Sequence, residues 1–346
     1  MAKIAINGFG RIGRLFFRQA FGQKGIDIVA INDLGDIENL AYLLKYDSVY
    51  RAYDKEVSFD RDASGVGGHL IVGGKKIQVI QEKEMAKLPW GALKIDVVVE
   101  STGAFESFEK SAPHVTAAGA KRVVISAPAK DAEGVAGGKT ILMGINDDQL
   151  GTCQVSSNGS CTTNATSPVV AVLHEALGIQ KAMLSTTHAY TATQNLTDSP
   201  TKGKDFRRGR AAANNIVPSS TGAAVSVTRG IPELKGKFDG IALRVPVVTG
   251  SLADITMLVK RKTTVEEVNS ILKVAAESKR WKGILEYTDE QLVSSDTIGM
   301  VHAALVDSQY TKVVDGDLVK VLSWYDNEWG YVTTLVDHVR KAADST

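Results

Sequence analysis

A cysteine among small polar residues is the first feature of this sequence that could do chemistry. Cys161 lies in the segment Ser157-Asn-Gly-Ser-Cys-Thr-Thr-Asn164, just upstream of a stretch with helical spacing. Polar neighbours favour partial exposure, and the N-terminus of a helix favours a thiolate. The alternative is a buried, inert cysteine in a turn. The context makes Cys161 a candidate nucleophile.

A helix end alone would not ionise this thiol. At a pKa near 8.5 only about 3% of a cysteine is thiolate at pH 7. Lowering that pKa by ~2 units needs about 2.7 kcal/mol, whereas a helix end supplies ~0.3–1 kcal/mol, and about 2 when partly buried. A second positive partner is therefore needed, most naturally a histidine. Among six histidines, His188 stands at the end of a strand expected over Ala182–Tyr190, where α/β enzymes place catalytic groups. The other five are expected on the surface or on helix faces.

The start of the helix after Cys161 has two interpretations. Pro168 lacks an N–H and clashes with the preceding turn, so helix rules favour Ser167 as N-cap and a helix over Pro168–Gly178. The alternative is a kinked helix that runs through Pro168. Only the kinked helix would bring its dipole to the thiol of Cys161.

A basic cluster lies between residues 202 and 210. A solvated loop is the usual state of such clusters. A nucleic-acid patch is a second interpretation, but Phe206 is the only aromatic residue inside it and the net charge of the chain is only +1. The third interpretation is a site for small phosphates, which arginine binds bidentately. The cluster comprises Lys202, Lys204, Arg207, Arg208 and Arg210.

Two features downstream support an anion site. Pro218-Ser-Ser-Thr221-Gly222 is typical of a hydroxyl-and-amide nest that leads into a helix. Arg244 lies inside the apolar strand expected over Ile241–Val248, where an unpaired cation would be costly. An anion that faces Arg244 would remove that cost.

A glycine-rich turn at the N-terminus predicts a dinucleotide site. Gly8, Gly10 and Gly13 follow the first strand and open the first helix. They would allow a tight turn, close approach of a pyrophosphate, and close packing of helix on strand. Asp33, 20 residues beyond Gly13, ends the second strand where a carboxylate would bind the ribose. Since the stretch Asn32–Glu38 holds no Arg, NAD is favoured over NADP.

The elements that must position these groups fall into two regions of the chain with different sequence patterns. Before residue 150, β-branched runs alternate with helical patterns, which predicts a doubly wound parallel sheet. After it, Ile241–Lys262 indicates two long strands or one bent strand, hence a largely antiparallel sheet in an α+β domain. The expected strands are Lys3–Asn7, Ile26–Ile31, Asp96–Glu100 and Arg122–Ser126, and the expected helices are Arg11–Phe21, Ile37–Leu44, Val265–Glu277 (N-cap Thr263 or Thr264) and Glu328–Ala343.

Length and composition exclude several classes of protein. At 346 residues, two domains are expected. A hydrophobic share of 44% and a net charge of +1 argue against a disordered chain and against nucleic-acid binding through bulk charge. Two cysteines exclude a disulfide framework and a Cys-rich zinc site, so no metal is expected. No apolar run reaches the length of a membrane span and no secretory signal is present, so we expect a soluble cytoplasmic protein.

Taken together, these motifs resemble the phosphorylating glyceraldehyde-3-phosphate dehydrogenase family. The match runs from Ile4 to about Ala342. It is carried by Asn7-Gly-Phe-Gly-Arg-Ile-Gly-Arg14, Leu43-Leu-Lys-Tyr-Asp47, Ser157-Asn-Gly-Ser-Cys-Thr-Thr-Asn164, Arg210-Ala-Ala-Ala213, Ser220-Thr-Gly-Ala-Ala224 and Trp324-Tyr-Asp-Asn-Glu-Trp-Gly-Tyr331. The resemblance implies the kinked helix with Cys161 at its N-terminus. It also implies an NAD-binding Rossmann domain over residues 1–160 and 327–346 and a catalytic domain over residues 161–326.

The resemblance further implies a role for each matching residue. Cys161 would be the nucleophile and His188 its base, in the NAD-dependent oxidative phosphorylation of D-glyceraldehyde 3-phosphate through a thiohemiacetal and a thioester. Besides the glycines, the cofactor contacts would be Arg11, Ile12, Asp33, Thr102, Ser126 and Asn327. The phosphate of the substrate would meet Thr191, Arg208 and Arg244, and inorganic phosphate would meet Ser160, Thr162, Thr221 and Gly222. A homotetramer is implied, with the loop Tyr190–Asn214 at subunit contacts.

Departures from the family pattern are few. Ala165 replaces a second cysteine, Gly159 replaces an alanine, and the segment Lys130–Lys139 is longer and rich in glycine. Thr193 stands where many members have aspartate, which leaves one contact near the substrate phosphate open. The alternatives are a non-phosphorylating erythrose-4-phosphate dehydrogenase, or a redox-sensing or RNA-binding role on the same fold.

Overall fold

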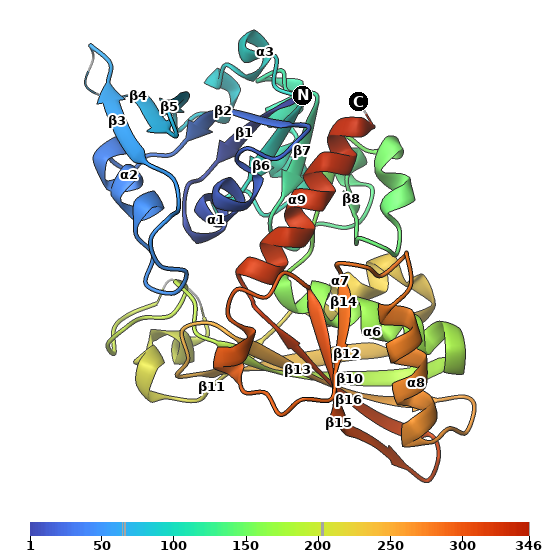
Figure 1. Ribbon diagram of the computed structural model, residues 1–346. Coiled ribbons are helices and arrows are strands. Elements are labelled where there is room, and N and C mark those ends of the chain that lie inside the picture. Colours follow the sequence, from blue (N-terminus) through green and yellow to red (C-terminus); the bar gives the residue numbers. More distant parts are fainter. Residues whose placement is uncertain (64, 66, 202–203, 346) are drawn as a thin grey trace. The chain divides into compact units, whose positions relative to one another are not determined.

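The computed structural model describes residues 1–63, 65, 67–201 and 204–345, and Figure 1 labels most of its helices and strands. Two compact units make up this part of the chain. Unit 1 comprises Met1–Gly159 and Val332–Thr346, and unit 2 comprises Ser160–Tyr331. The boundaries predicted from the sequence fall after residue 160 and before residue 327.

Unit 1 is built on a nine-stranded sheet with the order β3-β4-β5-β2-β1-β6-β7-β9-β8. The strands from β5 to β8 pair in parallel, whereas β3, β4 and β5 pair antiparallel at one edge. The strands are Ala2–Asn7 (β1), Ile26–Asn32 (β2), Val57–Arg61 (β3), Gly68–Val72 (β4), Lys75–Ile80 (β5), Val97–Glu100 (β6), Arg122–Ile125 (β7), Lys139–Thr140 (β8) and Val155–Ser157 (β9). The predicted doubly wound parallel sheet is confirmed, and the antiparallel edge was not predicted.

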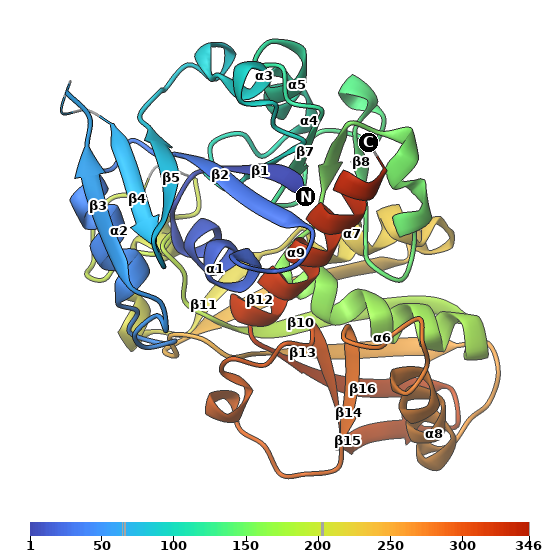
Figure 2. The ribbon, with the colours of Figure 1, turned by 45° about the horizontal axis from the view of Figure 1, so that its top comes forward.

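Helices cover both faces of this sheet (Figure 2). On one face α1 meets the C-terminal helix α9, where the hydroxyl of Thr333 donates to Gln19 Oε1 over 3.1 Å. On the other face α4 and α5 cover a core that includes Trp90, Phe108 and Val123. The helices are Arg11–Ala20 (α1), Ile37–Lys45 (α2), Trp90–Leu93 (α3), Phe108–Ser111 (α4), Pro113–Thr116 (α5) and Trp329–Asp344 (α9), the last of which begins in unit 2.

Unit 2 contains a seven-stranded sheet with the order β11-β12-β10-β13-β16-β15-β14. Two of its strand pairs, β10 with β12 and β14 with β15, are parallel, and the other four are antiparallel. The strands are Ile179–Ala189 (β10), Val217–Ser220 (β11), Phe238–Val245 (β12), Ser251–Val259 (β13), Leu285–Thr288 (β14), Ala304–Val314 (β15) and Leu318–Tyr325 (β16). The predicted largely antiparallel sheet is confirmed, and Ile241–Lys262 holds parts of two strands.

Among the described residues, three α-helices lie wholly within unit 2: Cys161–Leu177 (α6), Ala223–Gly230 (α7) and Val265–Ala276 (α8). They pack on one face of the sheet (Figure 2). The predicted helix over Val265–Glu277 is confirmed as α8, with Thr264 as its N-cap through a bond from the N–H of Glu267. Within the described residues, no helix combines the length and the apolar character that a membrane crossing requires.

Candidate active site

Helix α6 begins at Cys161, which corrects the start at Pro168 that helix rules favoured. The side chain of Ser160 accepts a hydrogen bond from the N–H of Thr163, and the hydroxyl of Thr163 accepts one from the N–H of Ser160. This reciprocal capping box satisfies two free N–H groups and stabilises the earlier start. Pro168 then lies inside the helix, where it removes one backbone bond to the preceding turn. The thiol of Cys161 thus stands on the first residue of a 17-residue helix.

The imidazole of His188 reaches this thiol from the sheet. His188 is 3% exposed near the end of β10, and Cys161 is partly exposed. Cys161 Sγ lies 3.3 Å from His188 Nε2. Within unit 2, the structure therefore brings together the two residues that the sequence singled out as nucleophile and base.

Arg244 stands directly beside His188. Strands β10 and β12 pair in parallel with His188 opposite Arg244, so both side chains project from the same face of the sheet. Arg244 Nη1 lies 2.7 Å from His188 Nδ1 and 3.1 Å from the carbonyl oxygen of Ala189. Arg244 Nε is buried with no hydrogen-bond partner among the described residues. The sequence predicted an anion-binding role for Arg244 but no contact with His188.

Burial and the Arg244 charge set the protonation of the pair. Burial, followed by the Arg244 charge, lowers the pKa of His188 to about 3. Burial raises the pKa of the Cys161 thiol, while the Arg244 charge and hydrogen bonds from Thr162 act in the opposite direction. Both shifts favour the uncharged form of the group concerned. Arg244 adds a positive charge beside the two residues, which the sequence analysis did not anticipate there.

A buried hydroxyl chain lies next to this pair. Tyr325 OH lies 2.9 Å from Thr162 Oγ1 and 2.7 Å from Thr186 Oγ1. Its ring meets the ring of His188 edge to face, with centroids 5.9 Å apart. Burial raises the pKa of Tyr325 far above its ordinary value, so the phenol stays protonated. The sequence analysis did not single out Tyr325, although this residue lies in the Trp324–Tyr331 motif. The hydroxyl of Thr162, which was predicted to meet inorganic phosphate, is hydrogen-bonded to Tyr325 instead.

The candidate anion-binding residues form a second group in unit 2. Arg208 Nη1 donates to Thr193 Oγ1 over 3.1 Å, and that oxygen lies 3.0 Å from Thr191 Oγ1. Thr193 thus links two predicted phosphate ligands with a neutral hydroxyl. Of the other basic residues in the cluster, Arg207 pairs with Asp205 and Arg210 with Asp198, and Lys202 lies outside the described residues.

The predicted nest at residues 218–222 combines the strand β11 with the start of α7. Gly222 is the N-cap of that helix, and the hydroxyl of Thr221 accepts a bond from the N–H of Ala223 over 3.2 Å. Strand β11 pairs with β12, with Val217 opposite Arg244. The nest therefore begins in β11, the strand next to β12, and β12 carries Arg244.

In unit 1, the three glycines meet the three requirements stated for a dinucleotide turn. Gly8 has φ +94°, and a Cβ there would lie 2.5 Å from the backbone nitrogen of Thr102. A Cβ on Gly13 would lie 2.1 Å from the carbonyl oxygen of Gly8, because α1 approaches β1 closely. A Cβ on Gly10 would meet open space, which leaves the backbone accessible to a ligand.

The other predicted cofactor contacts in unit 1 follow the carboxyl ends of parallel strands. Asp33 follows β2; its Oδ2 accepts a bond from the N–H of Phe9 over 2.6 Å and its Oδ1 one from the N–H of Gly35 over 2.8 Å. Thr102 is exposed after β6, and Ser126 is half-buried after β7. This edge is where open α/β sheets bind ligands. Ile12 lies in the first turn of α1, and Arg11 Nη1 pairs with Asp47 over 2.5 Å.

In unit 2, the side-chain oxygen of Asn327 accepts bonds from the N–H of Gly250 over 3.1 Å and the hydroxyl of Ser251 over 2.9 Å. These two bonds fix the amide and direct its NH₂ group away from β13.

A buried carboxylate that the sequence analysis missed supports the dinucleotide turn. Glu100 Oε2 accepts bonds from Asn7 Nδ2 (2.6 Å) and His114 Nε2 (3.0 Å), and its Oε1 accepts bonds from the N–H and the hydroxyl of Thr102 (2.8 and 2.5 Å). The N–H of Trp90 donates to His114 Nδ1, which fixes this tautomer. His114 was expected on a surface or helix face, and it is fully buried.

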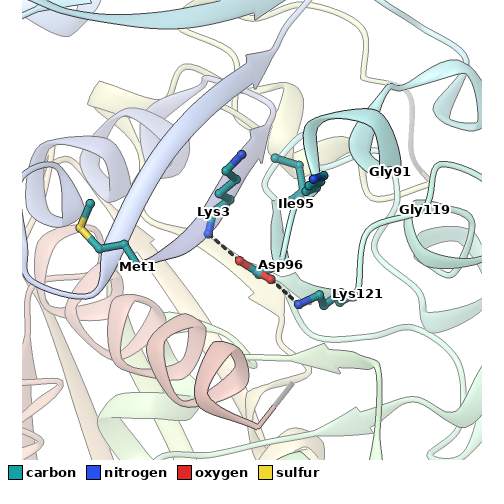
Figure 3. Close-up of a pocket in the computed structure, with 8 residues that line it drawn as sticks. Met1, Lys3, Gly91, Ile95, Asp96, Gly119 and Lys121 are labelled. Carbon is teal, nitrogen blue, oxygen red and sulfur yellow. Dashed lines mark hydrogen bonds and ion pairs between the residues drawn. The ribbon is translucent and has the colours of Figure 1, made fainter.

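A cavity of about 460 Å³ in unit 1 lies away from these groups (Figure 3). It is lined by residues at the start of β1 and just before β6 and β7, and therefore opens at the amino edge of the parallel strands. Asp96 in its wall binds the N–H of Lys3 and the ammonium of Lys121. The described residues hold no cluster of three His, Cys, Asp or Glu side chains that could bind a metal ion.

Comparison with known proteins gives the same picture along nearly the whole chain. Residues 2–108 match the family model "Glyceraldehyde 3-phosphate dehydrogenase, NAD binding domain", and residues 160–327 match "Glyceraldehyde 3-phosphate dehydrogenase, C-terminal domain". The chain is 49% identical over 345 residues to glyceraldehyde-3-phosphate dehydrogenase of Borreliella burgdorferi, covering 98% of this chain and 99% of that protein. It is 48% identical to the same enzyme of Geobacillus stearothermophilus, over 97% and 96% of the two chains.

Proposed function

The chain belongs to the glyceraldehyde-3-phosphate dehydrogenase family, and on this premise we propose how its residues divide the reaction. The protein is an NAD-dependent oxidoreductase that converts D-glyceraldehyde 3-phosphate and inorganic phosphate to 1,3-bisphosphoglycerate. The observation that carries the assignment of roles is the 3.3 Å contact of Cys161 Sγ with His188 Nε2 at the start of α6. The names of the relatives do not favour the erythrose-4-phosphate alternative.

Cys161 is the nucleophile, and its thiol gives its proton to His188 Nε2 as sulfur attacks the aldehyde carbon. The oxyanion of the thiohemiacetal is stabilised by the N–H of Cys161 at the helix N-terminus and by the protonated imidazole. Return of that proton to the oxyanion leaves His188 neutral. His188 then accepts the hydroxyl proton as the carbon–hydrogen bond is broken and the thioester forms. Inorganic phosphate attacks the thioester and releases the acyl phosphate.

Bound NAD supplies the hydride acceptor. We assign its binding to Gly8, Gly10, Gly13, Arg11, Ile12, Asp33, Thr102, Ser126 and Asn327. The open backbone at Gly10, the N-terminus of α1 and the fixed carboxylate of Asp33 fit a pyrophosphate and a ribose. We propose residues 1–160 and 327–346 as the NAD-binding domain and residues 161–326 as the catalytic domain.

Two groups of residues take the two phosphates. Thr191, Arg208 and Arg244 hold the phosphate of the aldehyde substrate, and Ser160, Thr162, Thr221 and Gly222 hold inorganic phosphate. Because the hydroxyl of Thr162 is bonded to Tyr325, its contribution is the backbone N–H at the start of α6. The unpartnered Nε of Arg244 supports its place in the first group, because an anion would satisfy it.

The test is NADH formation from glyceraldehyde 3-phosphate, with and without inorganic phosphate, and the same pair of assays with erythrose 4-phosphate. The Cys161→Ser variant is expected to lose acylation. Cys153→Ser is the matched control, because Cys153 is a buried cysteine in unit 1. Retention of a tenth of the rate by Cys161→Ser would contradict the covalent route. Phosphate-independent turnover that prefers erythrose 4-phosphate would favour the alternative activity.

We further propose a homotetramer that works in the cytoplasm. Met183 and Ile241 are about half exposed on adjacent strands, and Leu196 and Phe206 are more than three-quarters exposed in the loop Tyr190–Asn214. Large apolar side chains with that exposure are typical of subunit contacts. A cytoplasmic location suits the mechanism, because the mechanism needs the thiol of Cys161 in its reduced form and thiols are kept reduced in the cytoplasm. Sedimentation equilibrium tests the tetramer, and a monomer at micromolar concentration would contradict it.

A further inference from the structure

An arginine from a distant strand stands at the segment that follows β2. Arg61, the last residue of β3, binds Asp36 through two contacts, Nη1 to Oδ2 over 2.9 Å and Nη2 to Oδ1 over 3.2 Å. Its Nη2 also lies 3.5 Å from Glu38 Oε2. The sequence analysis favoured NAD over NADP because the stretch Asn32–Glu38 holds no Arg. The fold supplies one from 25 positions beyond Asp36.

The packing of α2 against β3 puts Arg61 in this place (Figure 1). Asp36 is the N-cap of α2, and its side chain also accepts bonds from the N–H groups of Glu38 and Asn39. The guanidinium of Arg61 lies over the ring of Phe59, which is two positions earlier and projects from the same face of β3. The carboxylate is thus fixed at the start of the helix, and the guanidinium is directed to it.

Asp36 stands close to the proposed ribose position at Asp33. The two residues are three positions apart, so their Cα atoms lie within about 11 Å of each other. The N–H of Gly35 donates to Asp33 Oδ1 over 2.8 Å, which bends the segment between them and shortens that distance. Salt screens charges at such distances only in part. A phosphate on the 2′-oxygen of a ribose bound at Asp33 would therefore interact with the carboxylate of Asp36 and with the arginine that holds it.

From this geometry we propose that Arg61 is a latent ligand for a 2′-phosphate, and that Asp36 and Glu38 keep it occupied and so make the site prefer NAD. The inference rests on the proposed cofactor site at Asp33. The carboxylates of Asp33, Asp36 and Glu38 outnumber the guanidinium of Arg61, so the charge of this group of four opposes a dianion. A 2′-phosphate must also compete for the N–H groups of Arg61, because arginine binds carboxylate and phosphate in the same bidentate way.

The ion pair lies where one partner can be exchanged for another. The side chains of Arg61, Asp36 and Glu38 are 37%, 54% and 68% exposed, and exposed ion pairs contribute little to stability. The hydrogen bond from Arg61 is the main cause that lowers the pKa of Asp36, so this carboxylate is charged at neutral pH. Asparagine caps helices as well as aspartate does. Asp36→Asn therefore releases the guanidinium and keeps the start of α2.

The test is the affinity of the full-length protein for adenosine 2′,5′-bisphosphate relative to 5′-AMP, measured by calorimetry. The two probes differ only in the 2′-phosphate. Asp36→Asn should raise the relative affinity for the bisphosphate about tenfold, and addition of Glu38→Gln should raise it further. Addition of Arg61→Gln should remove most of that gain. Asp60→Asn is the matched control and should keep the wild-type ratio, because Asp60 projects from the opposite face of β3 and pairs with Lys76.

A kinetic readout accompanies the binding data. The ratio of kcat/KM for NADP to that for NAD should rise in the variants that gain affinity for the bisphosphate, with unchanged melting temperatures. A gain in Asp36→Asn that persists in full after Arg61→Gln overturns the role of Arg61, and so does an unchanged ratio in Asp36→Asn with Glu38→Gln. In both cases 5′-AMP that competes with NAD leaves the proposed cofactor site intact. Failure of 5′-AMP to compete with NAD overturns that site and the inference with it.

Discussion

Replacing Arg244 by leucine should make the thiol of Cys161 harder to ionise. Arg244 Nη1 lies 2.7 Å from one nitrogen of the His188 ring, and Cys161 Sγ lies 3.3 Å from the other. The guanidinium is therefore within roughly 8 Å of the sulfur, and at an effective dielectric constant of about 20 two unit charges at that distance interact by about 2 kcal/mol. A cation favours the thiolate, so its loss raises the pKa of the Cys161 thiol. The same loss raises the pKa of His188, since the Arg244 charge contributes to holding it at about 3.

The assay is the rate of alkylation of Cys161 by iodoacetamide as a function of pH, in the protein without substrate. The inflection should move to higher pH in Arg244→Leu, and the rate at a fixed pH below it should fall by more than tenfold. Arg244→Lys keeps the charge and should retain most of the wild-type profile, while Arg261→Leu controls for loss of an arginine elsewhere. An unchanged inflection in Arg244→Leu, with an unchanged melting temperature, would refute the electrostatic reasoning.

Four further substitutions test other parts of the molecule. Asp33→Asn should raise the ratio of kcat/KM for NADP to that for NAD by about tenfold or more, because a negative charge beside a 2′-phosphate is removed; an unchanged ratio would mean that Asp33 does not face the ribose. Ser160→Ala should cost about 1 kcal/mol in urea unfolding through loss of the α6 cap and should also slow acylation. Thr264→Ala, which uncaps α8, should cost a similar amount with no effect on acylation. Burial lowers the pKa of both His338 and His188 to about 3, so the unfolded chain binds these protons first, and stability should fall as pH drops below 6.5 by up to about 1.4 kcal/mol per pH unit for each histidine. His338→Gln should remove about half of that slope, and an equally steep slope in the variant would contradict this assignment.

Several elements could be predicted because their information is local. The apolar runs of β1, β2, β6 and β7 and the glycine turn after β1 each depend on residues adjacent in the chain. For the same reason, the sequence limited the N-cap of α8 to two candidates, Thr263 and Thr264, of which Thr264 is the cap. The start of α6 was placed wrongly by helix rules, because two local signals compete there: a proline at 168 and a capping box at 160 and 163. The capping box stabilises the earlier start at Cys161, and the helix continues through Pro168.

The protonation of the site could not be predicted from the sequence. It depends on how far His188 and Cys161 are buried and on which charge stands beside them. Arg244 is 56 positions from His188 in sequence and reaches it only because β10 and β12 pair in that register. The hydroxyl chain through Tyr325 likewise joins β16 to α6 and β10.

By itself the sequence determined the identity of the reacting groups: a thiol, an imidazole, a glycine turn with its acidic residue, and arginines able to bind phosphate. Residue type and local spacing fix those properties before any long-range contact forms. Only the tertiary structure decided that the cation beside the imidazole is Arg244, that burial raises the pKa of the thiol and lowers that of the imidazole, and that Glu100 holds the turn that carries Thr102. Those properties depend on strand register and on the exclusion of water, which exist only after distant segments have packed together.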